Sequence, residues 1–229
     1  CAGAPIPGPL VEQAQVGLGA KIVSAWGMTE NGAVTLIKLD DDDKLASTTD
    51  GCALPGVEVK VVDGDGNALP AGEIGKLLVR ACSNFGGYLK RPQWNGTDAG
   101  GWFDTGDLAY MTQGGYIRIS GRSKDVIIRG GENIPVVEVE ALIYKHPAVA
   151  QVAIVAYPDE RLGERACAVV VPKAGQTIDL AGMIDFLKSH RLAIQYIPEK
   201  LIVREAMPAT PSGKIQKFRL RDMLKSGEL

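Results

Sequence analysis

The spacing of apolar residues changes near residue 121, and this change restricts the folds open to the chain. Before it, short β-type runs alternate with Gly-rich turns. Residues 57–62 and 74–79 are strand candidates on either side of an Asp-Gly turn. Residues 116–119 are another candidate, directly after a Gly-Gly turn. This part of the chain therefore predicts a Gly-rich, antiparallel and barrel-like β unit.

After residue 121, helical and strand patterns alternate. Some apolar residues recur at helical spacing, whereas two continuous apolar runs have the length of strands. We expect helices at 136–144, 180–190 and 217–224, and strands at 149–156, 166–171 and 200–203. Such a mixture over about 100 residues indicates a compact α+β domain. The whole chain is thus expected to be mixed α/β (α+β), with domains at 1–121 and 122–229.

Composition argues against several classes of partner. A formal net charge of −2 gives no broad positive field for nucleic acid or an anionic membrane. We find no secretory signal and no apolar run long enough to span a bilayer. The four cysteines never form a C-x-x-C pair, which favours reduced thiols in a cytoplasmic protein over a structural zinc site. The sequence does not predict an oligomeric state.

Two further features concern the chain itself. It opens with Cys1 rather than Met, and we expect a fragment of a longer protein. The four aspartates at 40–43 are expected to form a solvated acidic loop rather than a ligand site.

Four segments carry residues suited to chemistry. The first is 26–30, Trp-Gly-Met-Thr-Glu, which ends a strand-like run at 21–25. An aromatic ring, a glycine, a hydroxyl and a carboxylate suit a base face, a phosphate and its Mg²⁺. On its own, an ordinary turn at the end of a strand explains this segment better.

The second segment is 101–108, in which Asp107 follows a glycine. A carboxylate in such a place can accept both hydrogens of a ribose diol. The alternative is a β-turn in which the aspartate caps its own backbone.

The third segment is 121–134 and the fourth is 208–217. Arg122 can bind an oxyanion or a sugar, and Gly130-Gly131 forms a loop that a ligand can approach closely. The alternative for this segment is a charged hairpin between domains. In the fourth segment, prolines and a glycine present one lysine, Lys214, which could stabilise charge developing on a phosphate or carboxylate. A surface lysine at a helix N-terminus is the alternative there.

In this order and spacing, the four segments resemble the core motifs of the adenylate-forming superfamily of acyl-CoA synthetases, non-ribosomal peptide adenylation domains and luciferases. The resemblance runs over nearly the whole chain. Residues 146–149 and 158–164 also resemble the C-terminal domain of acyl-CoA synthetases. The form of segment 130–134, and the end of the chain soon after Lys214, favour a free-standing acyl-CoA ligase.

The resemblance implies a nucleotide site in the first domain. Its expected members, which would contact ATP or AMP, are Gly3, Ala4, Pro5, Trp26, Gly27, Thr29, Asp107 and Arg122. Trp26 would flank adenine, Thr29 would contact the α-phosphate and Asp107 would bind the ribose hydroxyls. Glu30 would help to hold Mg²⁺.

It also implies roles in a small, mobile C-terminal domain. Lys124 would be the hinge about which this domain rotates between two active conformations. Gly130, Gly131 and Glu132 would line the tunnel for coenzyme A after rotation. Lys214 would stabilise the phosphate and carboxylate as acyl-AMP forms. Transfer of the acyl group to CoA would follow.

One family feature is missing from residues 1–229. The Ser/Thr/Gly-rich loop that cradles the β- and γ-phosphates, and most of the acid pocket, should lie upstream, so residues 1–121 would be an incomplete part of a large domain. We therefore expect this chain alone to be inactive. The acid stays open, and Gly27, Met28 and Asn31 are the candidates here for contact with it. The alternatives are an adenylation domain serving a carrier protein and a non-catalytic nucleotide- or CoA-binding module.

Overall fold

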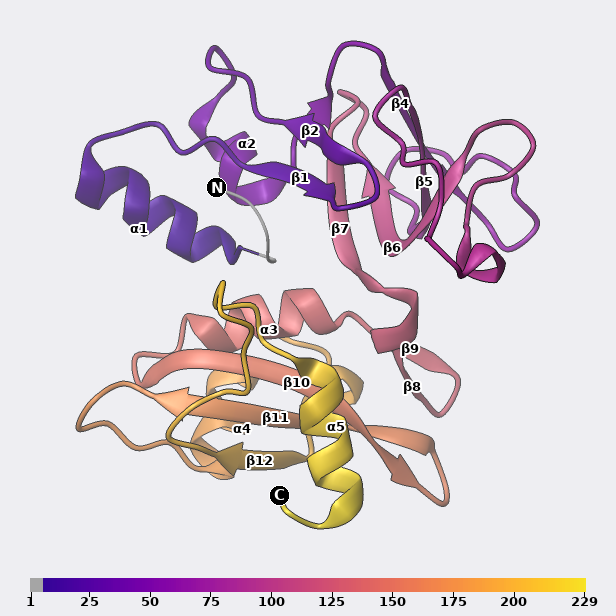
Figure 1. Ribbon diagram of the computed structural model, residues 1–229. Coiled ribbons are helices and arrows are strands. Elements are labelled where there is room, and N and C mark those ends of the chain that lie inside the picture. The colour runs from indigo at the N-terminus through magenta and orange to yellow at the C-terminus, as the bar shows by residue number, and fades with distance from the viewer. Residues whose placement is uncertain (1–5) are drawn as a thin grey trace. The chain divides into compact units, whose positions relative to one another are not determined.

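The computed structural model describes residues 6–229, which divide into two compact units between Lys124 and Asp125. Both units combine helices with β-sheets, so the predicted mixed α/β class is confirmed (Figure 1). The division lies three residues after the domain boundary expected from the sequence. Among residues 6–229, no helix has the length and apolar character needed to cross a membrane.

The first unit contains two antiparallel sheets. The first sheet consists of β1 (Ala25–Met28), β2 (Gly32–Leu36) and β3 (Cys52–Ala53). The second consists of β4 (Val57–Val62), β5 (Gly75–Ala81), β6 (Phe103–Met111) and β7 (Ile117–Arg122), paired in chain order. The helices are α1 (Gly8–Leu18) and α2 (Asp43–Thr48), with 3₁₀ turns η1 (Pro92–Trp94) and η2 (Ser123–Asp125).

These sheets do not close into a barrel. A barrel closes only when its first and last strands pair, and β4 and β7 are the two outer strands of an open sheet. One isolated bridge, between Cys52 and Tyr116, connects the two sheets. The Gly-rich antiparallel character of the prediction is thus confirmed, whereas residues 6–124 form no closed barrel.

One local expectation for the first unit is wrong, and another is confirmed only in part. The strand expected at 21–25 lies at Ala25–Met28, because the hairpin turn that follows it comes only at Thr29–Asn31. The aspartates at 40–43 are not simply a solvated loop. Asp42 is the N-cap of α2 and accepts a hydrogen bond from the Lys44 N–H at 2.8 Å.

The second unit contains one five-stranded sheet. Its strands are β8 (Ile127–Arg129), β9 (Glu132–Ile134), β10 (Val149–Asp159), β11 (Gly163–Pro172) and β12 (Lys200–Val203). They pair in the order β10-β11-β8-β9, and β12 pairs in parallel with β11. The helices are α3 (Val136–Tyr144), α4 (Leu180–Ser189) and α5 (Lys217–Ser226), with a 3₁₀ turn η3 (Ile194–Tyr196). The bounds of α3 and β12 are those predicted from the sequence.

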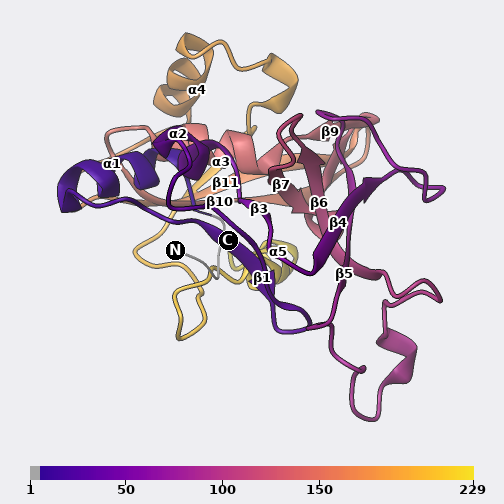
Figure 2. The ribbon, with the colours of Figure 1, turned by 90° about the horizontal axis from the view of Figure 1, so that it is seen from above.

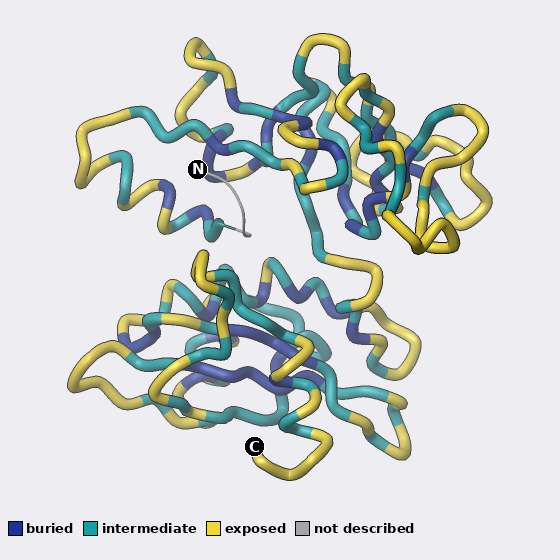
Figure 3. Tube along the Cα trace, viewed as in Figure 1, coloured by how far each residue is buried: buried dark blue, intermediate teal, exposed yellow. Residues whose placement is uncertain are grey.

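Helices cover both faces of this sheet (Figures 1 and 2). Successive side chains of a strand point to opposite faces. Ile154 of β10 accordingly packs in the cluster with α3 and α4, whereas Val155 packs with Leu220 of α5. Both faces are therefore buried, as the dark central strands of Figure 3 show, and this explains the continuous apolar runs in the sequence.

Candidate functional site

A nearly buried carboxylate, that of Asp107, joins three strands of the first unit. Asp107 lies on β6, and its side chain is 8% exposed. The indole Nε1 of Trp26, on β1, donates to Asp107 Oδ2 at 3.1 Å. The guanidinium Nε of Arg122, directly across from Asp107 on β7, donates to Oδ1 at 3.0 Å. Three of the predicted site residues are thus in direct contact.

Backbone and side-chain contacts hold Asp107 in this place. Thr105 Oγ1 donates to the Leu77 carbonyl at 2.8 Å and accepts the Asp107 N–H at 3.1 Å. Gly106 has a φ of +70°, a conformation that favours glycine. The Asp104 carboxylate accepts the Gly106 N–H at 2.9 Å. The backbone-capping role considered for Asp107 therefore belongs to Asp104.

The ring of Trp26 is positioned by the core of the second sheet. It packs on the cluster formed by Val61, Leu77, Ala109 and Ile117. Gly27, the next residue, lies at a bulge in the pairing of β1 with β2. A Cβ there would lie 2.1 Å from the Gly32 carbonyl oxygen. β2, the neighbouring strand of the same hairpin, therefore comes so close to residue 27 that glycine is required there.

Thr29 and Glu30 lie in the turn that joins β1 to β2. Thr29 is exposed and Glu30 is half-buried. The hydroxyl of Tyr88 donates to Glu30 Oε1 at 2.5 Å, and the Phe85 N–H donates to the Glu30 carbonyl at 2.7 Å. The hydrogen bond to Glu30 raises the pKa of the Tyr88 hydroxyl. The connection between β5 and η1 thus fixes the position of this carboxylate.

The same connection contacts Asn31. Its side chain is fully buried and donates through Nδ2 to Asn84 Oδ1 at 2.8 Å. Its Oδ1 has no hydrogen-bond partner among residues 6–229. Neither Asn84 nor Tyr88 was predicted as a site residue, because each partner lies more than 50 residues away in the sequence and no motif links them.

The metal-binding role predicted for Glu30 would have to rest on this one carboxylate, because the described residues contain no cluster of metal ligands. Within 6–229, no group of three or more His, Cys, Asp or Glu side chains could hold an ion. Mg²⁺ usually keeps several waters and binds through one or two carboxylates together with substrate phosphates. Glu30 beside the exposed Thr29 hydroxyl fits such a site.

The second unit carries the predicted Gly-Gly loop as a tight hairpin. Gly130 and Gly131 connect β8 to β9, with φ angles of +59° and +90°. Positive φ at both central residues is the requirement of a type I′ turn, which glycine meets without strain. Glu132 is exposed at the start of β9. The alternative is therefore right that this segment forms a hairpin but wrong that the hairpin lies between domains, because β8 and β9 belong to the sheet of the second unit. A hairpin does not exclude a ligand at this loop.

Lys124 and Lys214 lie in different units. Lys124 is exposed in η2, at the last position of the first unit. Lys214 lies in a hairpin-like loop before α5, where Ala209 bridges to Ile215 and Thr210 exchanges backbone hydrogen bonds with Lys214 and Gly213. The Lys214 ammonium forms no ion pair with any residue from 6 to 229. Its backbone is fixed, but its side-chain nitrogen is not.

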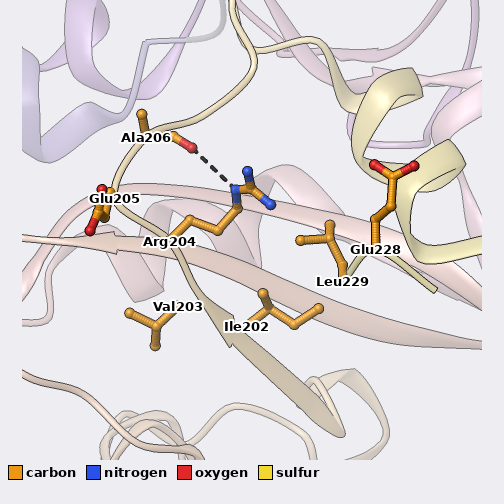
Figure 4. A pocket seen from close by; sticks show the side chains of 7 residues that line it. All are labelled: Ile202, Val203, Arg204, Glu205, Ala206, Glu228 and Leu229. Carbon is orange, nitrogen blue, oxygen red and sulfur yellow. Dashed lines mark hydrogen bonds between the residues drawn. The ribbon is translucent and has the colours of Figure 1, made fainter. Parts of the chain in front are cut away.

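A groove of about 540 Å³ lies elsewhere in the second unit (Figure 4). Arg204 Nε donates to the Ala206 carbonyl there at 3.3 Å. The lining residues are Ile202, Val203, Arg204, Glu205, Ala206, Glu228 and Leu229. None of them is a predicted site residue. Gly3, Ala4 and Pro5, the remaining predicted site residues, lie outside the part of the chain that the structure describes.

Two family models match the chain. Residues 1–89 match that of the AMP-binding enzymes, and residues 138–214 match that of the AMP-binding enzyme C-terminal domain. The matches fall in different units of the structure and together include segment 26–30 and Lys214, whereas Asp107, Arg122 and segment 130–134 lie between the two matched ranges.

Individual relatives agree with these matches. The chain is 42% identical over 224 residues to a medium-chain fatty-acid–CoA ligase of Escherichia coli K12, covering 96% of this chain and 39% of the relative. It is 37% identical to enterobactin synthase component E of the same organism, covering 98% and 42%. ATP-bound MatB from Rhodopseudomonas palustris superposes with a TM-score of 0.92 at 33% identity, covering 100% and 45%. The chain spans about two fifths of the length of the curated relatives it matches.

Proposed function

The chain belongs to the adenylate-forming superfamily of AMP-binding enzymes, and from this membership we propose that the protein is an AMP-forming acid–thiol ligase. It activates a carboxylic acid with ATP and transfers the acyl group to coenzyme A. The acid is a small molecule whose identity these residues do not specify.

The contact of Trp26, Asp107 and Arg122 is the observation that most strongly supports this proposal. These residues come from separate motifs and separate strands, yet one carboxylate binds donors from both of the others. A carboxylate held by fixed donors is prepared to accept the hydroxyls of a ribose without further reorganisation. An indole ring beside it offers a flat face for adenine. We propose that Gly3, Ala4 and Pro5 complete the adenine side.

In the first half-reaction, a carboxylate oxygen of the acid attacks the α-phosphorus of ATP. The bond from this phosphorus to the pyrophosphate oxygen breaks, and pyrophosphate leaves. Thr29 would contact the α-phosphate through its exposed hydroxyl, and Lys214 would place its ammonium against the phosphate and carboxylate oxygens that share the developing charge. Glu30 would hold Mg²⁺, which neutralises charge on the phosphates when bound.

In the second half-reaction, the CoA sulfur attacks the acyl carbon. The sulfur releases its proton to solvent, the bond between the acyl carbon and the phosphate oxygen breaks, and AMP leaves with that oxygen. We propose that Lys124 is the hinge between the two half-reactions, since it is exposed at the last position of the first unit. Gly130, Gly131 and Glu132 would then line the path of the pantetheine arm, where glycine leaves the backbone accessible.

The acceptor is the least constrained part of this proposal. Relatives include a vibriobactin-specific 2,3-dihydroxybenzoate–AMP ligase, and one similar structure is an amide bond synthetase. An adenylation enzyme that serves a carrier protein is therefore the second candidate. We favour CoA because the relative with 42% identity is a CoA ligase. We also propose a cytoplasmic location, in keeping with three described cysteines that are all free thiols.

Pyrophosphate exchange tests the proposal. The complete protein that contains this chain should exchange labelled pyrophosphate into ATP when given its acid, with octanoate and salicylate tried first. It should form a thioester when CoA is added. Exchange without any thioester would favour the carrier-protein alternative, and nucleotide binding without exchange would favour a non-catalytic module. Residues 1–229 alone should not exchange, because they contain no Ser/Thr/Gly-rich triphosphate loop.

A further inference from the structure

The Gly130–Gly131 hairpin has few backbone contacts with the rest of the sheet. β8 pairs with β11 through a single residue pair, Arg129 with Gly163. The two glycines carry no side chains that could anchor the turn. The remaining backbone contact is the Gly130 N–H, which donates to the Leu162 carbonyl at 2.9 Å. The position of this hairpin must therefore depend on side chains around it.

Ile127 and Ile134 anchor the far end of the hairpin in the core, and Glu164 Oε2 accepts the Ile128 N–H at 2.9 Å. Nearer the turn, Glu199 supplies a charged side-chain contact. Arg129, which directly precedes the Gly130–Gly131 turn, donates through Nε to Glu199 Oε1 at 2.6 Å. Glu199 lies directly before β12, and its own N–H donates to the Ala166 carbonyl at 3.1 Å. Glu199 Oε2 accepts the Ala166 N–H at 3.4 Å. One carboxylate thus links the hairpin to the middle of the sheet.

The turn that meets the hairpin is held by the same group of charges. Arg165 lies 3.8 Å from Glu199 Oε1 and 2.6 Å from Asp159 Oδ2. Asp159 in turn accepts the N–H groups of Arg161 and Leu162 at 3.0 and 2.8 Å. The Leu162 carbonyl that receives Gly130 is therefore fixed through Asp159 and Arg165. We define these four residues, Arg129, Asp159, Arg165 and Glu199, as the hairpin clamp.

We infer that Glu199 is a positioning residue for the CoA half-reaction: through the hairpin clamp it holds the Gly130–Gly131 hairpin where the pantetheine arm must pass. This inference rests on the proposed function for the role of the hairpin, but not for the clamp itself. The clamp residues are 19–30% exposed. These ion pairs are therefore partly buried rather than exposed. Their loss is expected to lower the stability of the second unit to some extent as well as to change the position of the loop.

The test uses Glu199→Gln, which keeps the size of the side chain and removes its charge. The matched control is Glu138→Gln, because Glu138 is exposed on α3 and forms no ion pair with residues 6–229. Both variants are made in the complete protein. Hydrogen exchange of the amides at 129–132 measures the hairpin directly. Pyrophosphate exchange and the reaction of preformed acyl-adenylate with CoA measure the two half-reactions separately.

We expect Glu199→Gln to speed amide exchange at 129–132 and to lower kcat/KM for CoA by roughly 10- to 100-fold, the cost of a reactant misplaced by about 1 Å. Adenylation should stay within about twofold of the wild type, and Glu138→Gln should change nothing. Arg129→Lys, which keeps the charge, should give a smaller loss in the CoA step. Unchanged amide exchange, or an equal loss in both half-reactions, would overturn the inference. A wild type that lacks pyrophosphate exchange would contradict the proposed function instead, and amide exchange would still decide whether the clamp holds the hairpin.

Discussion

Asp107 and Lys214 carry opposite charges and are held in opposite ways. Asp107 is nearly buried on a central strand and has donors from two other strands. Lys214 lies on a loop whose backbone is bonded to itself, and its ammonium forms no ion pair with residues 6–229. One group is positioned before any ligand arrives, whereas the other keeps its side chain available.

This difference agrees with the chemistry that we propose for each. A ribose is bound throughout both half-reactions, so a permanently fixed acceptor suits it. The charge that Lys214 would stabilise develops only while acyl-AMP forms. A fixed partner for its ammonium in the resting protein would have to be removed first, at a cost. The comparison predicts that changes at Asp107 affect both folding and binding, whereas changes at Lys214 affect only chemistry.

The largest effect is expected for Lys214→Ala. Loss of the ammonium should lower the rate of adenylation by roughly 10²–10³-fold, the usual cost of removing one oxyanion donor. The melting temperature should not change, since no described residue loses an ion-pair partner. Pyrophosphate exchange and thermal unfolding measure the two quantities. Thioester formation from preformed acyl-AMP is the internal control, and an equal loss there would contradict the role given to Lys214.

Lys124→Pro tests whether the two units must move. Proline restricts φ to about −65° and removes the N–H, so rotation at this residue should be hindered. We expect the CoA half-reaction to slow by roughly 10- to 100-fold through misplacement of the second unit, and adenylation to slow less. Lys124→Ala, which keeps an unrestricted backbone, is the control. Equal rates for wild type and Lys124→Pro in both half-reactions would remove the hinge from the mechanism.

Asp107→Asn tests the fixed group. The amide keeps the shape but weakens the hydrogen bonds from Trp26 and Arg122, each worth about 1.5–3 kcal/mol when one partner is charged. We expect a lower free energy of unfolding for the first unit and about a tenfold rise in the KM for ATP. Denaturant unfolding and exchange kinetics measure these effects. Asp104→Asn is the control, since Asp104 is exposed and the amide oxygen of asparagine can still accept the Gly106 N–H. An unaltered stability would show that Asp107 is not held as the structure suggests.

The sequence predicted those elements whose signal is local. The helix α3 and the strand β12 were found with their observed bounds, because apolar spacing alone defines them. α1 was missed: it begins between two prolines and contains Gly17, so its apolar spacing is weak and its one deeply buried side chain is Val11. α2 was missed because six residues are too few for a periodic pattern. Asp42 is a typical N-cap residue, but it was predicted only as part of an acidic loop.

For the candidate site, the order of the motifs predicted the site residues themselves but not the residues that position them. Asp107 and Arg122 were identified separately, and their direct pairing follows from the register of β6 with β7. Tyr88 and Glu199 could not be found in this way. Their partners lie 58 and 70 residues away, and only the folded chain brings them together. Residues that position a site through long-range contacts leave no spacing that a sequence pattern can reveal.

Glu30 lies between the two extremes of the comparison, and it gives the smallest expected effect. It is half-buried and receives one side-chain donor, the Tyr88 hydroxyl. In Tyr88→Phe, the carboxylate keeps its charge but loses this donor, at a cost of about 1 kcal/mol. The Mg²⁺ concentration that gives half-maximal pyrophosphate exchange should then rise by about fivefold. Tyr110→Phe is the matched control, because its hydroxyl makes no hydrogen bond with residues 6–229. If both variants need the same Mg²⁺ concentration as the wild type, Tyr88 does not position a metal-binding carboxylate. The Glu30 side chain would then resemble that of Lys214, whose position no partner among residues 6–229 fixes.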